Sequence, residues 1–204
     1  MLTNFGLYLI ITNPTLTYQE IARIAVKHNL RYLQLREKHL SDRELIAVSK
    51  EIMKITNNTK TKFIINDRAD IAKIVDADGL HLGQDDISLA DAKSIFGENK
   101  IYGLSTHSLQ QAQKALAEKP DYIGYGPIFP TPTKVNPDPT VGLENIKQVV
   151  ASSSLPVVHL GGIDESNVDA VINAGAKNVC LVRYLMECED LEERVVKIMS
   201  KFGR

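Results

Sequence analysis

The chain has 204 residues, of which 44% are hydrophobic and 24% charged, and its formal net charge is −1. This length suits one sizeable domain, and the near-zero charge gives no reason to expect nucleic acid or an anionic membrane as a partner. No signal-peptide pattern or membrane-spanning apolar stretch is present, and Cys180 and Cys188 lack the spacing of a disulfide framework or a zinc site. We therefore expect a cytosolic protein with a single domain over residues 1–204.

Short apolar runs alternate with helical patterns along the chain. Strands are expected at 7–12, 33–36, 63–65, 79–82, 101–104, 122–125, 156–160 and 177–182. Helices are expected at 18–28, 41–54, 69–74, 88 onward, 108–117, 142–150, 165–174 and 191–199. Two helix starts carry capping signals, because Ser41 with Glu44 forms a capping box and Ser108 with Gln111 has the same spacing.

The alternation of eight strands with eight helices, at about 25 residues per unit, predicts a parallel sheet with helical crossovers. Eight such units close a barrel. The competing fold is a doubly wound open sheet, which usually has a Gly-rich turn after the first strand, where this chain has Thr12-Asn13-Pro14. We predict an α/β fold, a single-domain (β/α)₈ TIM barrel with parallel strands.

Two acidic residues follow consecutive strands of this pattern. Asp67 comes directly after the strand at 63–65, and Asp86 follows the strand at 79–82. Parallel strands place their carboxyl ends at one edge, so the two carboxylates should meet there and repel each other unless a cation lies between them. Oxygen ligands at a sheet edge suit Mg²⁺ bound together with a substrate phosphate. The alternative is that each aspartate caps the helix that follows it.

The connection at 126–140 is the longest one expected, and it holds five of the chain's eight prolines. Thr131, Thr133 and Lys134 supply two hydroxyls and a cation within it. Long connections in compact domains are usually functional loops or disordered segments, and the prolines limit the conformational freedom of this one. We interpret it as a functional loop, and the alternative is a connection without a role in the site.

Polar and glycine residues recur just past the strand ends, which share one face of a barrel. They are Gln34, Arg36, Lys38, Asn66, Asp67, Asp86, Ser105, Thr106, His107, Thr131, Thr133, Lys134, Gly161, Gly162, Ile163, Val182 and Arg183. Nearly all are suitable partners for phosphate or Mg²⁺. A diphosphate would be held by Mg²⁺ with Arg36, Lys38 and Lys134. A monophosphate would lie across the mouth, where Gly161 and Gly162 allow close backbone approach and the next helix presents its N-terminus.

Each of these residues also has a purely structural interpretation. The segment 36–38 has the composition of a solvated charge run. Gln34 can be a hydrogen-bonded amide in the core, and the glycine pair can be a simple turn. His81 and His159 lie inside predicted strands, where a lone histidine is more often a hydrogen-bonded core residue than a catalyst. The functional interpretation rests on the convergence of all these residues on one face.

Five motifs together resemble those of the thiamin-phosphate synthase family. They are Gln34-Leu-Arg-Glu-Lys38, Asn66-Asp67-Arg68, Gly79-Leu-His-Leu-Gly-Gln-Asp-Asp86, Gly126-Pro-Ile-Phe-Pro-Thr-Pro-Thr-Lys134 and Gly161-Gly-Ile163. The resemblance covers nearly the whole chain. It implies a transferase that joins hydroxymethylpyrimidine diphosphate to thiazole phosphate and releases thiamin phosphate and pyrophosphate. Such a reaction needs charge stabilisation and positioning and no covalent nucleophile.

The resemblance also implies residue roles. Asp67 and Asp86 would bind Mg²⁺. Catalytic roles fall to Arg36, Lys38, Ser105 and Lys134. Substrate-binding roles fall to Gln34, Leu35, Arg36, Glu37, Lys38, Asn66, Ser105, Thr131, Pro132, Thr133, Lys134, Gly162, Val182 and Arg183. The two phosphorylated precursors are then the partners, and the sequence leaves open whether the chain forms a homo-oligomer and whether the thiazole carries a carboxylate.

Two alternatives stay open. The first is the related thiazole tautomerase, which shares the barrel. Tautomerases look as though they carry a histidine where this chain has Pro127, and they tend to lack the acidic pair Asp85-Asp86. Both differences favour the synthase. A barrel that binds a phosphorylated thiamin precursor without catalysis is the second alternative. It is favoured only by Arg183, which stands with Val182 where the family usually has a small Ser-containing segment.

Overall fold

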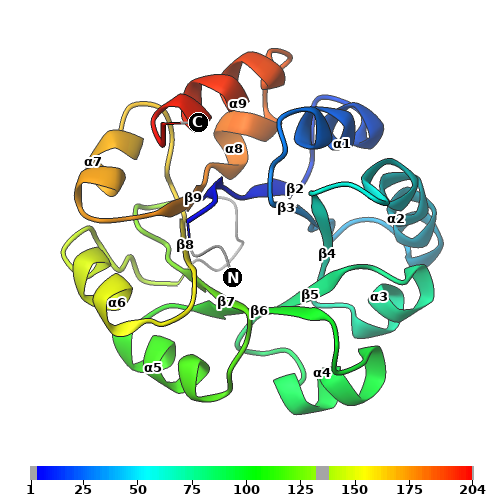
Figure 1. Cartoon of the computed structure of the whole chain (residues 1–204), viewed down its shortest axis with the longest axis horizontal. Coiled ribbons are helices and arrows are strands. Elements are labelled where there is room, and N and C mark those ends of the chain that lie inside the picture. The colour runs from blue at the N-terminus through cyan, green and yellow to red at the C-terminus, as the bar shows by residue number, and fades with distance from the viewer. Residues whose placement is uncertain (1–3, 132–137, 204) are drawn as a thin grey trace.

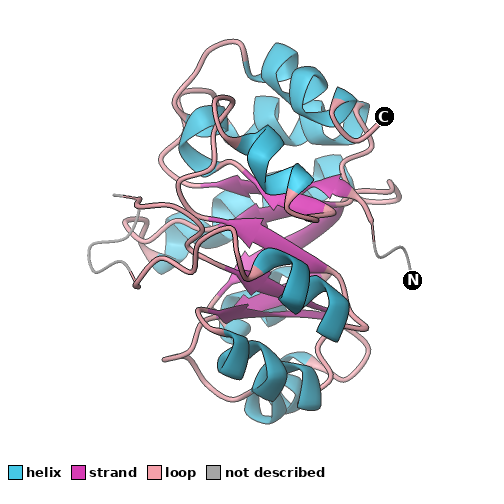
Figure 2. Ribbon diagram, turned by 90° about the vertical axis from the view of Figure 1, so that its left-hand side faces the viewer, coloured by secondary structure: helices cyan, strands magenta, loops and turns pink. Residues whose placement is uncertain are grey.

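The computed structural model describes residues 4–131 and 138–203, so Pro132, Thr133 and Lys134 lie outside the described residues. The described chain forms a ring of parallel strands surrounded by helices, seen down the ring in Figure 1 and from the side in Figure 2. The strand order around the ring is β1-β9-β8-β7-β6-β5-β4-β3-β2, and each neighbouring pair is parallel. The predicted (β/α)₈ barrel is confirmed.

The strands within the described residues are β1 (Gly6–Leu7), β2 (Leu9–Ile11), β3 (Tyr32–Leu35), β4 (Lys62–Asn66), β5 (Gly79–Leu82), β6 (Ile101–Thr106), β7 (Tyr122–Tyr125), β8 (Val157–Leu160) and β9 (Asn178–Cys180). The helices are α1 (Tyr18–Lys27), α2 (Asp42–Thr56), α3 (Ala69–Val75), α4 (Leu89–Phe96), α5 (Leu109–Ala117), α6 (Ile146–Ser152), α7 (Val168–Asn173), α8 (Val182–Met186) and α9 (Leu191–Ser200). No helix in this part of the chain is long and apolar enough to cross a membrane.

The first strand closes the ring. It is divided at Tyr8 into β1, which pairs with β9, and β2, which pairs with β3. Asn178 of β9 holds the junction, because its side-chain oxygen accepts from the backbone N–H groups of Phe5 at 2.7 Å and Gly6 at 3.2 Å. Its amide nitrogen donates to the carbonyl of Val157 at 3.1 Å. One buried side chain thus joins the first strand to the last two.

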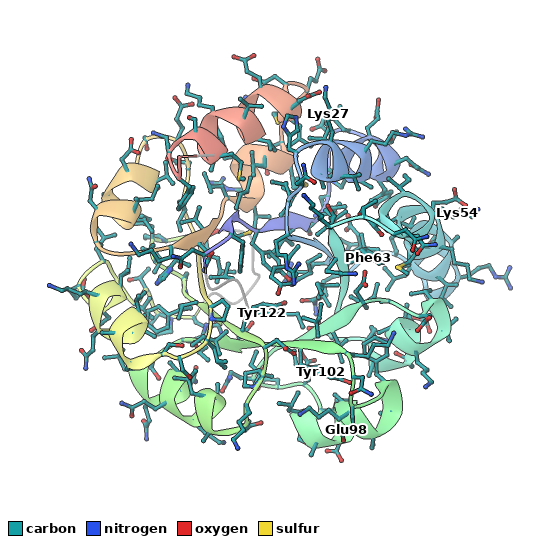
Figure 3. The ribbon with its side chains drawn as sticks, in the orientation of Figure 1. Lys27, Lys54, Phe63, Glu98, Tyr102 and Tyr122 are labelled. Carbon is teal, nitrogen blue, oxygen red and sulfur yellow. The ribbon has the colours of Figure 1, made fainter. Side chains whose placement is uncertain are left out.

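Alternate residues of each strand point to opposite faces of the sheet, which gives the barrel two apolar layers. Outward side chains such as Phe63 of β4 and Tyr102 of β6 pack between strands and helices, whereas Tyr8, Tyr32 and Tyr122 fill the interior. Figure 3 shows Tyr122 inside the ring and Phe63 and Tyr102 outside it. The aromatic filling makes the barrel interior a packed core.

The helices begin where the capping signals predict. Ser41 and Glu44 form the expected capping box at α2, with each side chain accepting from the other residue's backbone N–H. The Ser108 hydroxyl accepts from the backbone N–H of Gln111 at 3.1 Å and starts α5. A further capping box, for which no prediction was made, starts α1. These bonds satisfy N–H groups that a helix terminus otherwise leaves unpaired.

Boundaries differ from the prediction in the last third of the chain. α6 and α7 each begin about a turn later than expected, and the last predicted strand ends at Cys180. β9 stops there because its partner β8 ends at Leu160, opposite Cys180, and offers no further ladder. Val182 and Arg183 were expected at the end of a strand and instead form the first turn of α8. The helix that follows Gly162, expected from 165, accordingly has its N-terminus at Val168.

Candidate active site

A cavity of about 360 Å³ opens at the carboxyl ends of the strands. The predicted site residues that line it are Gln34, Arg36, Asn66, Ser105, Thr106, His107, Thr131, Gly161, Gly162, Ile163, Val182 and Arg183. They come from loops and strands on every side of the ring, so the fold brings together residues that are far apart in the sequence. Lys38, Asp67 and Asp86 do not line the cavity itself.

Lys38, Asp67 and Asp86 form a charged cluster around the strand ends of β3, β4 and β5. The Lys38 ammonium forms an ion pair with the Asp67 carboxylate. Asp67 adopts a left-handed backbone conformation, with φ of 62°, and its N–H donates to the carbonyl of His81 at 2.8 Å. The adjacent Asn66 lines the cavity, so the cluster borders the cavity along this edge.

Asp86 faces the same cluster from the neighbouring loop. Its carboxylate accepts from the backbone N–H of Gly83 at 2.6 Å. Burial raises the pKa of Asp86 above its usual value. The Asp67 carboxyl, which lies within hydrogen-bonding reach, raises it further, and the charge of Lys38 lowers it. The helix-capping interpretation is wrong for both acids, because α3 has no side-chain cap and Ser88 caps α4.

The segment 34–38 divides between the cavity and the core. Gln34 and Arg36 line the cavity, while Leu35 packs in the outer apolar layer. The buried Glu37 accepts from the backbone N–H of Asn13 at 2.8 Å and from the hydroxyl of Tyr18 at 3.2 Å. Burial raises the pKa of Glu37. This segment is therefore not a solvated charge run, and the side chains of Leu35 and Glu37 point away from the cavity.

Hydrogen bonds from β6 hold the start of the long connection. The Thr106 hydroxyl donates to the carbonyl of Gly124 at 2.8 Å, and the His107 ring bonds through Nδ1 to the carbonyl of Gly126 at 2.6 Å. The other ring nitrogen of His107 lies 3.4 Å from a carboxylate oxygen of Asp138, near the end of that connection. His107 thus links the two ends of the long connection at the wall of the cavity.

Gly161 and Gly162 lie directly against the start of the long connection. Both have a positive φ, and a side chain on either would overlap the backbone of the loop, at Pro127 and Pro130 respectively. The backbone N–H of Phe129 donates to the carbonyl of Gly161 at 3.0 Å. The glycine pair is therefore more than a turn, because it allows two backbones to approach closely at the cavity wall.

The short helix α8 supplies the wall opposite the charged cluster. Val182, Arg183 and Tyr184 line the cavity there, and Arg183 is exposed. The Arg194 guanidinium donates to the carbonyl of Tyr184 at 2.7 Å, pairs with Asp190 at 2.8 Å and lies 4.7 Å from the Tyr184 ring centre. Sequence reasoning missed Arg194, because on α9 it has the spacing of an ordinary surface residue.

The two strand histidines have different environments. His81 lines the cavity and bonds through Nε2 to the Ser105 hydroxyl at 2.9 Å and through Nδ1 to the Tyr122 hydroxyl at 3.1 Å. His159 is a core residue, as expected, and burial lowers its pKa to about 4. Its Nε2 and the Tyr125 hydroxyl are the buried side-chain atoms without a hydrogen-bond partner among the described residues.

The charged cluster offers two carboxylates to a metal ion. Within the described ranges, no group of three or more His, Cys, Asp or Glu side chains is placed to hold a metal by itself. Two carboxylate ligands with remaining positions for water and phosphate match the coordination that Mg²⁺ prefers. Burial is the main cause that raises the pKa of Asp86, and the neighbouring Asp67 carboxyl adds to it. A cation bound between the two carboxylates would relieve the repulsion between them.

Known proteins are similar to this chain in sequence and in fold. A profile of the thiamine monophosphate synthase family matches residues 7–185. The thiamine-phosphate synthase of Caldicellulosiruptor bescii is 36% identical over 188 residues, which cover 91% of this chain and 86% of that protein. The corresponding protein of Gloeobacter violaceus is 41% identical over 198 residues, which cover 97% of this chain and 58% of that longer protein.

A solved structure agrees with these matches. Thiamine phosphate pyrophosphorylase from Pyrococcus furiosus has a TM-score of 0.87 and 31% sequence identity to this chain, and the match covers 100% of this chain and 98% of that one. The family match, the identities and the shared fold extend over the strand ends that form the cavity. The chain therefore belongs to the thiamine monophosphate synthase family.

Proposed function

We propose that the chain is a thiamin-phosphate synthase, a transferase that moves the hydroxymethylpyrimidine group from its diphosphate to thiazole phosphate and releases pyrophosphate. The names of the relatives support this activity. The observation that carries it is the charged cluster of Lys38, Asp67 and Asp86, which borders a cavity lined by Arg36 and Asn66. Opposed charges of this kind suit a metal-bound diphosphate.

The diphosphate would lie along the β3, β4 and β5 edge of the cavity. Asp67 and Asp86 would hold Mg²⁺, and Arg36 and Lys38 would contact the phosphate oxygens. Lys38 would then exchange its ion pair with Asp67 for one with the substrate. When bound, Mg²⁺ would neutralise charge on the departing pyrophosphate. Lys134 would contribute from the long connection, although it lies outside the described residues.

The thiazole phosphate would lie across the cavity, between the long connection and α8. Thr131, Gly162, Val182 and Arg183 line this side. The first N–H groups of a helix have no intrahelical partner, so the start of α8 can donate to phosphate oxygens. Departure of pyrophosphate leaves a cation on the aminopyrimidine, and the thiazole nitrogen attacks it. The protein's part in this step is to hold both rings in line and to exclude water.

The test is a coupled pyrophosphate-release assay on the purified chain. Release should require both phosphorylated precursors and Mg²⁺. Release without the thiazole phosphate would indicate hydrolysis and contradict transfer, and release unaffected by a metal chelator would contradict the metal role. No release, with thiazole phosphate still bound in calorimetry, would indicate a non-catalytic binder. Conversion of a thiazole precursor without pyrophosphate release would indicate the tautomerase.

A few expectations stand as predictions beside this proposal. They are the single domain over residues 1–204, the cytosolic location and the absence of nucleic acid partners. The roles of Leu35 and Glu37 in substrate binding also stay predictions, and the directions of their side chains favour contacts through their backbone atoms.

A further inference from the structure

A chain of hydrogen bonds crosses the barrel interior beneath the cavity. The Gln34 amide nitrogen donates to the Tyr8 hydroxyl at 2.9 Å, and the Tyr8 and Tyr122 hydroxyls lie 2.7 Å apart. Tyr122 lies 3.1 Å from His81 Nδ1, and His81 Nε2 lies 2.9 Å from the Ser105 hydroxyl. Both ends of this series of hydrogen bonds, which we call the relay, line the cavity. The family resemblance implies a substrate-binding role for each end.

Most of the relay residues are buried and closely packed in the barrel interior. Gln34, Tyr8 and Tyr122 are each 1% exposed, so their polar atoms depend on one another and not on solvent. Gly103 of β6 provides the space, because a side chain there would overlap the Tyr122 hydroxyl and His81 Nδ1. The Tyr122 ring also stacks on the His81 ring, with centres 5.5 Å apart. A buried network of this kind is stable only when each of its members is satisfied.

The relay has a direction, because its members have fixed proton counts. Burial raises the pKa of Tyr8 and of Tyr122 far above the usual value, so each hydroxyl carries one proton and donates once. In a neutral imidazole one nitrogen donates and the other accepts. If the Gln34 amide nitrogen donates to Tyr8, then Tyr8 donates to Tyr122 and Tyr122 donates to His81 Nδ1.

The last hydrogen bond of the relay is the one between His81 and Ser105. His81 accepts at Nδ1 and therefore donates from Nε2 to the Ser105 oxygen, which leaves the Ser105 proton for a ligand. In the opposite direction the Tyr8 proton would meet the Gln34 amide nitrogen and remain unpaired, unless the amide is rotated. The hydrogen-bonding character of Gln34 is therefore coupled to that of Ser105 across the barrel.

We propose that Tyr8, Tyr122 and His81 are positioning residues that fix Gln34 as an acceptor and Ser105 as a donor toward the pyrimidine. This inference rests on the proposed function. An aminopyrimidine presents an amine donor beside a ring nitrogen acceptor, which is the complement of this pair. The relay thus selects a ring with that pattern over one in which a carbonyl replaces the amine, because the carbonyl would face an acceptor and leave buried groups unpaired.

The kinetic test uses Tyr122→Phe, which removes the central hydroxyl and keeps the ring. We expect kcat/KM for the pyrimidine diphosphate to fall by on the order of 10-fold, with KM for thiazole phosphate unchanged. Tyr102→Phe is the matched control, because the Tyr102 hydroxyl bonds to the carbonyl of Gly97 outside the barrel interior. Equal loss toward both substrates would indicate a structural defect and overturn the proposal.

A double-mutant cycle tests the coupling itself. In a Ser105→Ala background the hydroxyl at the end of the relay is absent. Tyr122→Phe should then lower kcat/KM by less than about 2-fold further. Independent effects, with the full loss from Tyr122→Phe retained in the Ser105→Ala protein, would show that the relay does not act through Ser105.

A spectroscopic test is independent of activity. Nitrogen NMR of the wild-type protein labelled at histidine reports the tautomer of each ring, and His81→Asn assigns the His81 signals among those of the five histidines. We expect the His81 ring to carry its proton on Nε2. A proton on Nδ1, or a protonated ring, would overturn the relay even in an active enzyme, whereas the expected tautomer in an inactive protein would contradict only the proposed function.

Discussion

The two sides of the cavity are built by different means. The side formed by β3, β4 and β5 consists of charged side chains that already interact, since Lys38 pairs with Asp67 and Asp67 lies against Asp86. The side formed by β8 depends on close packing of backbone, because Gly161 and Gly162 lie directly against the long connection. The first side is specified by charge and the second by shape.

This difference predicts two kinds of sensitivity. On the charged side a substitution that keeps the volume and removes the charge should abolish function with little effect on folding. On the glycine side a substitution that adds one methyl group should disturb the packing of the loop, and function should change as a consequence. The four predictions below test this contrast, from the largest expected effect to the smallest.

Asp67→Asn should give the largest loss. It keeps the shape of the side chain and removes one of the two carboxylates proposed for Mg²⁺. We expect Mg²⁺-dependent turnover to fall on the order of 100-fold or more, since even changes outside the ligand shell cost up to about 100-fold in metal sites. Steady-state kinetics across a Mg²⁺ titration measure the loss. Asp70→Asn, in the first turn of α3, is the control, and unchanged kinetics in Asp67→Asn would mean that the metal lies elsewhere.

Arg36→Ala should weaken binding of the pyrimidine diphosphate. A hydrogen bond to a charged group contributes about 1.5–3 kcal/mol, so KM for this substrate should rise about 10- to 100-fold. The melting temperature should change little, because Arg36 is half-buried at the cavity wall. The exposed Arg43 provides the matched control as Arg43→Ala. A rise in KM for thiazole phosphate alone would mean that Arg36 contacts that substrate and would contradict its proposed contact with the diphosphate.

Gly161→Ala should act through shape. The substitution places a methyl group against Pro127 in a left-handed backbone conformation, which should cost about 1–3 kcal/mol of unfolding free energy. Urea denaturation measures this cost, and KM for thiazole phosphate should rise more than KM for the pyrimidine diphosphate. Gly97 also has a positive φ, but a methyl group there would meet no atom within 4 Å. Gly97→Ala therefore isolates backbone strain, and an equal loss in both variants would remove the role of loop contact.

His159 gives a pH dependence to the glycine side. Its folded-state pKa, lowered to about 4 by burial, lies below the ordinary value of about 6.5. The unfolded chain thus binds the proton more readily, so the stability contributed is present above pH 6.5 and is lost as the pH falls toward 4, by at most ~3 kcal/mol. His159→Met should flatten this part of the curve of melting temperature against pH. The exposed His39 serves as control in His39→Gln, and an unchanged slope in His159→Met would contradict the assignment.

The sequence predicted the barrel because its signal is repeated along the whole chain. Alternating apolar runs and helical patterns indicate parallel strands with crossovers, and polar residues after each run fall on one face whatever the details of packing. Asp67, Asp86 and Arg36 were found in this way. Their positions depend on strand order alone, which the pattern supplies.

Other features depend on contacts between distant segments and have no local signal. The apolar run that ends at Val182 has the pattern of a continuing strand, but β9 ends earlier because its neighbour does. Arg194 reaches the cavity wall only because α9 packs beside α8. The pairing of Lys38 with Asp67 and the bonding of His81 to Tyr122 likewise join residues from different strands and loops.

The junction at Asn178 has a consequence for the order of folding. Its bonds to Phe5 and Gly6 span more than 170 positions of sequence. Proteins are synthesised from the N-terminus, and contacts between distant positions form late. The first strand therefore leaves the ribosome long before its partner in β9 exists, and the ring can close only after β9 has been made. Until then Tyr8 lacks its enclosure, so the interior of the site is completed in the last step of folding.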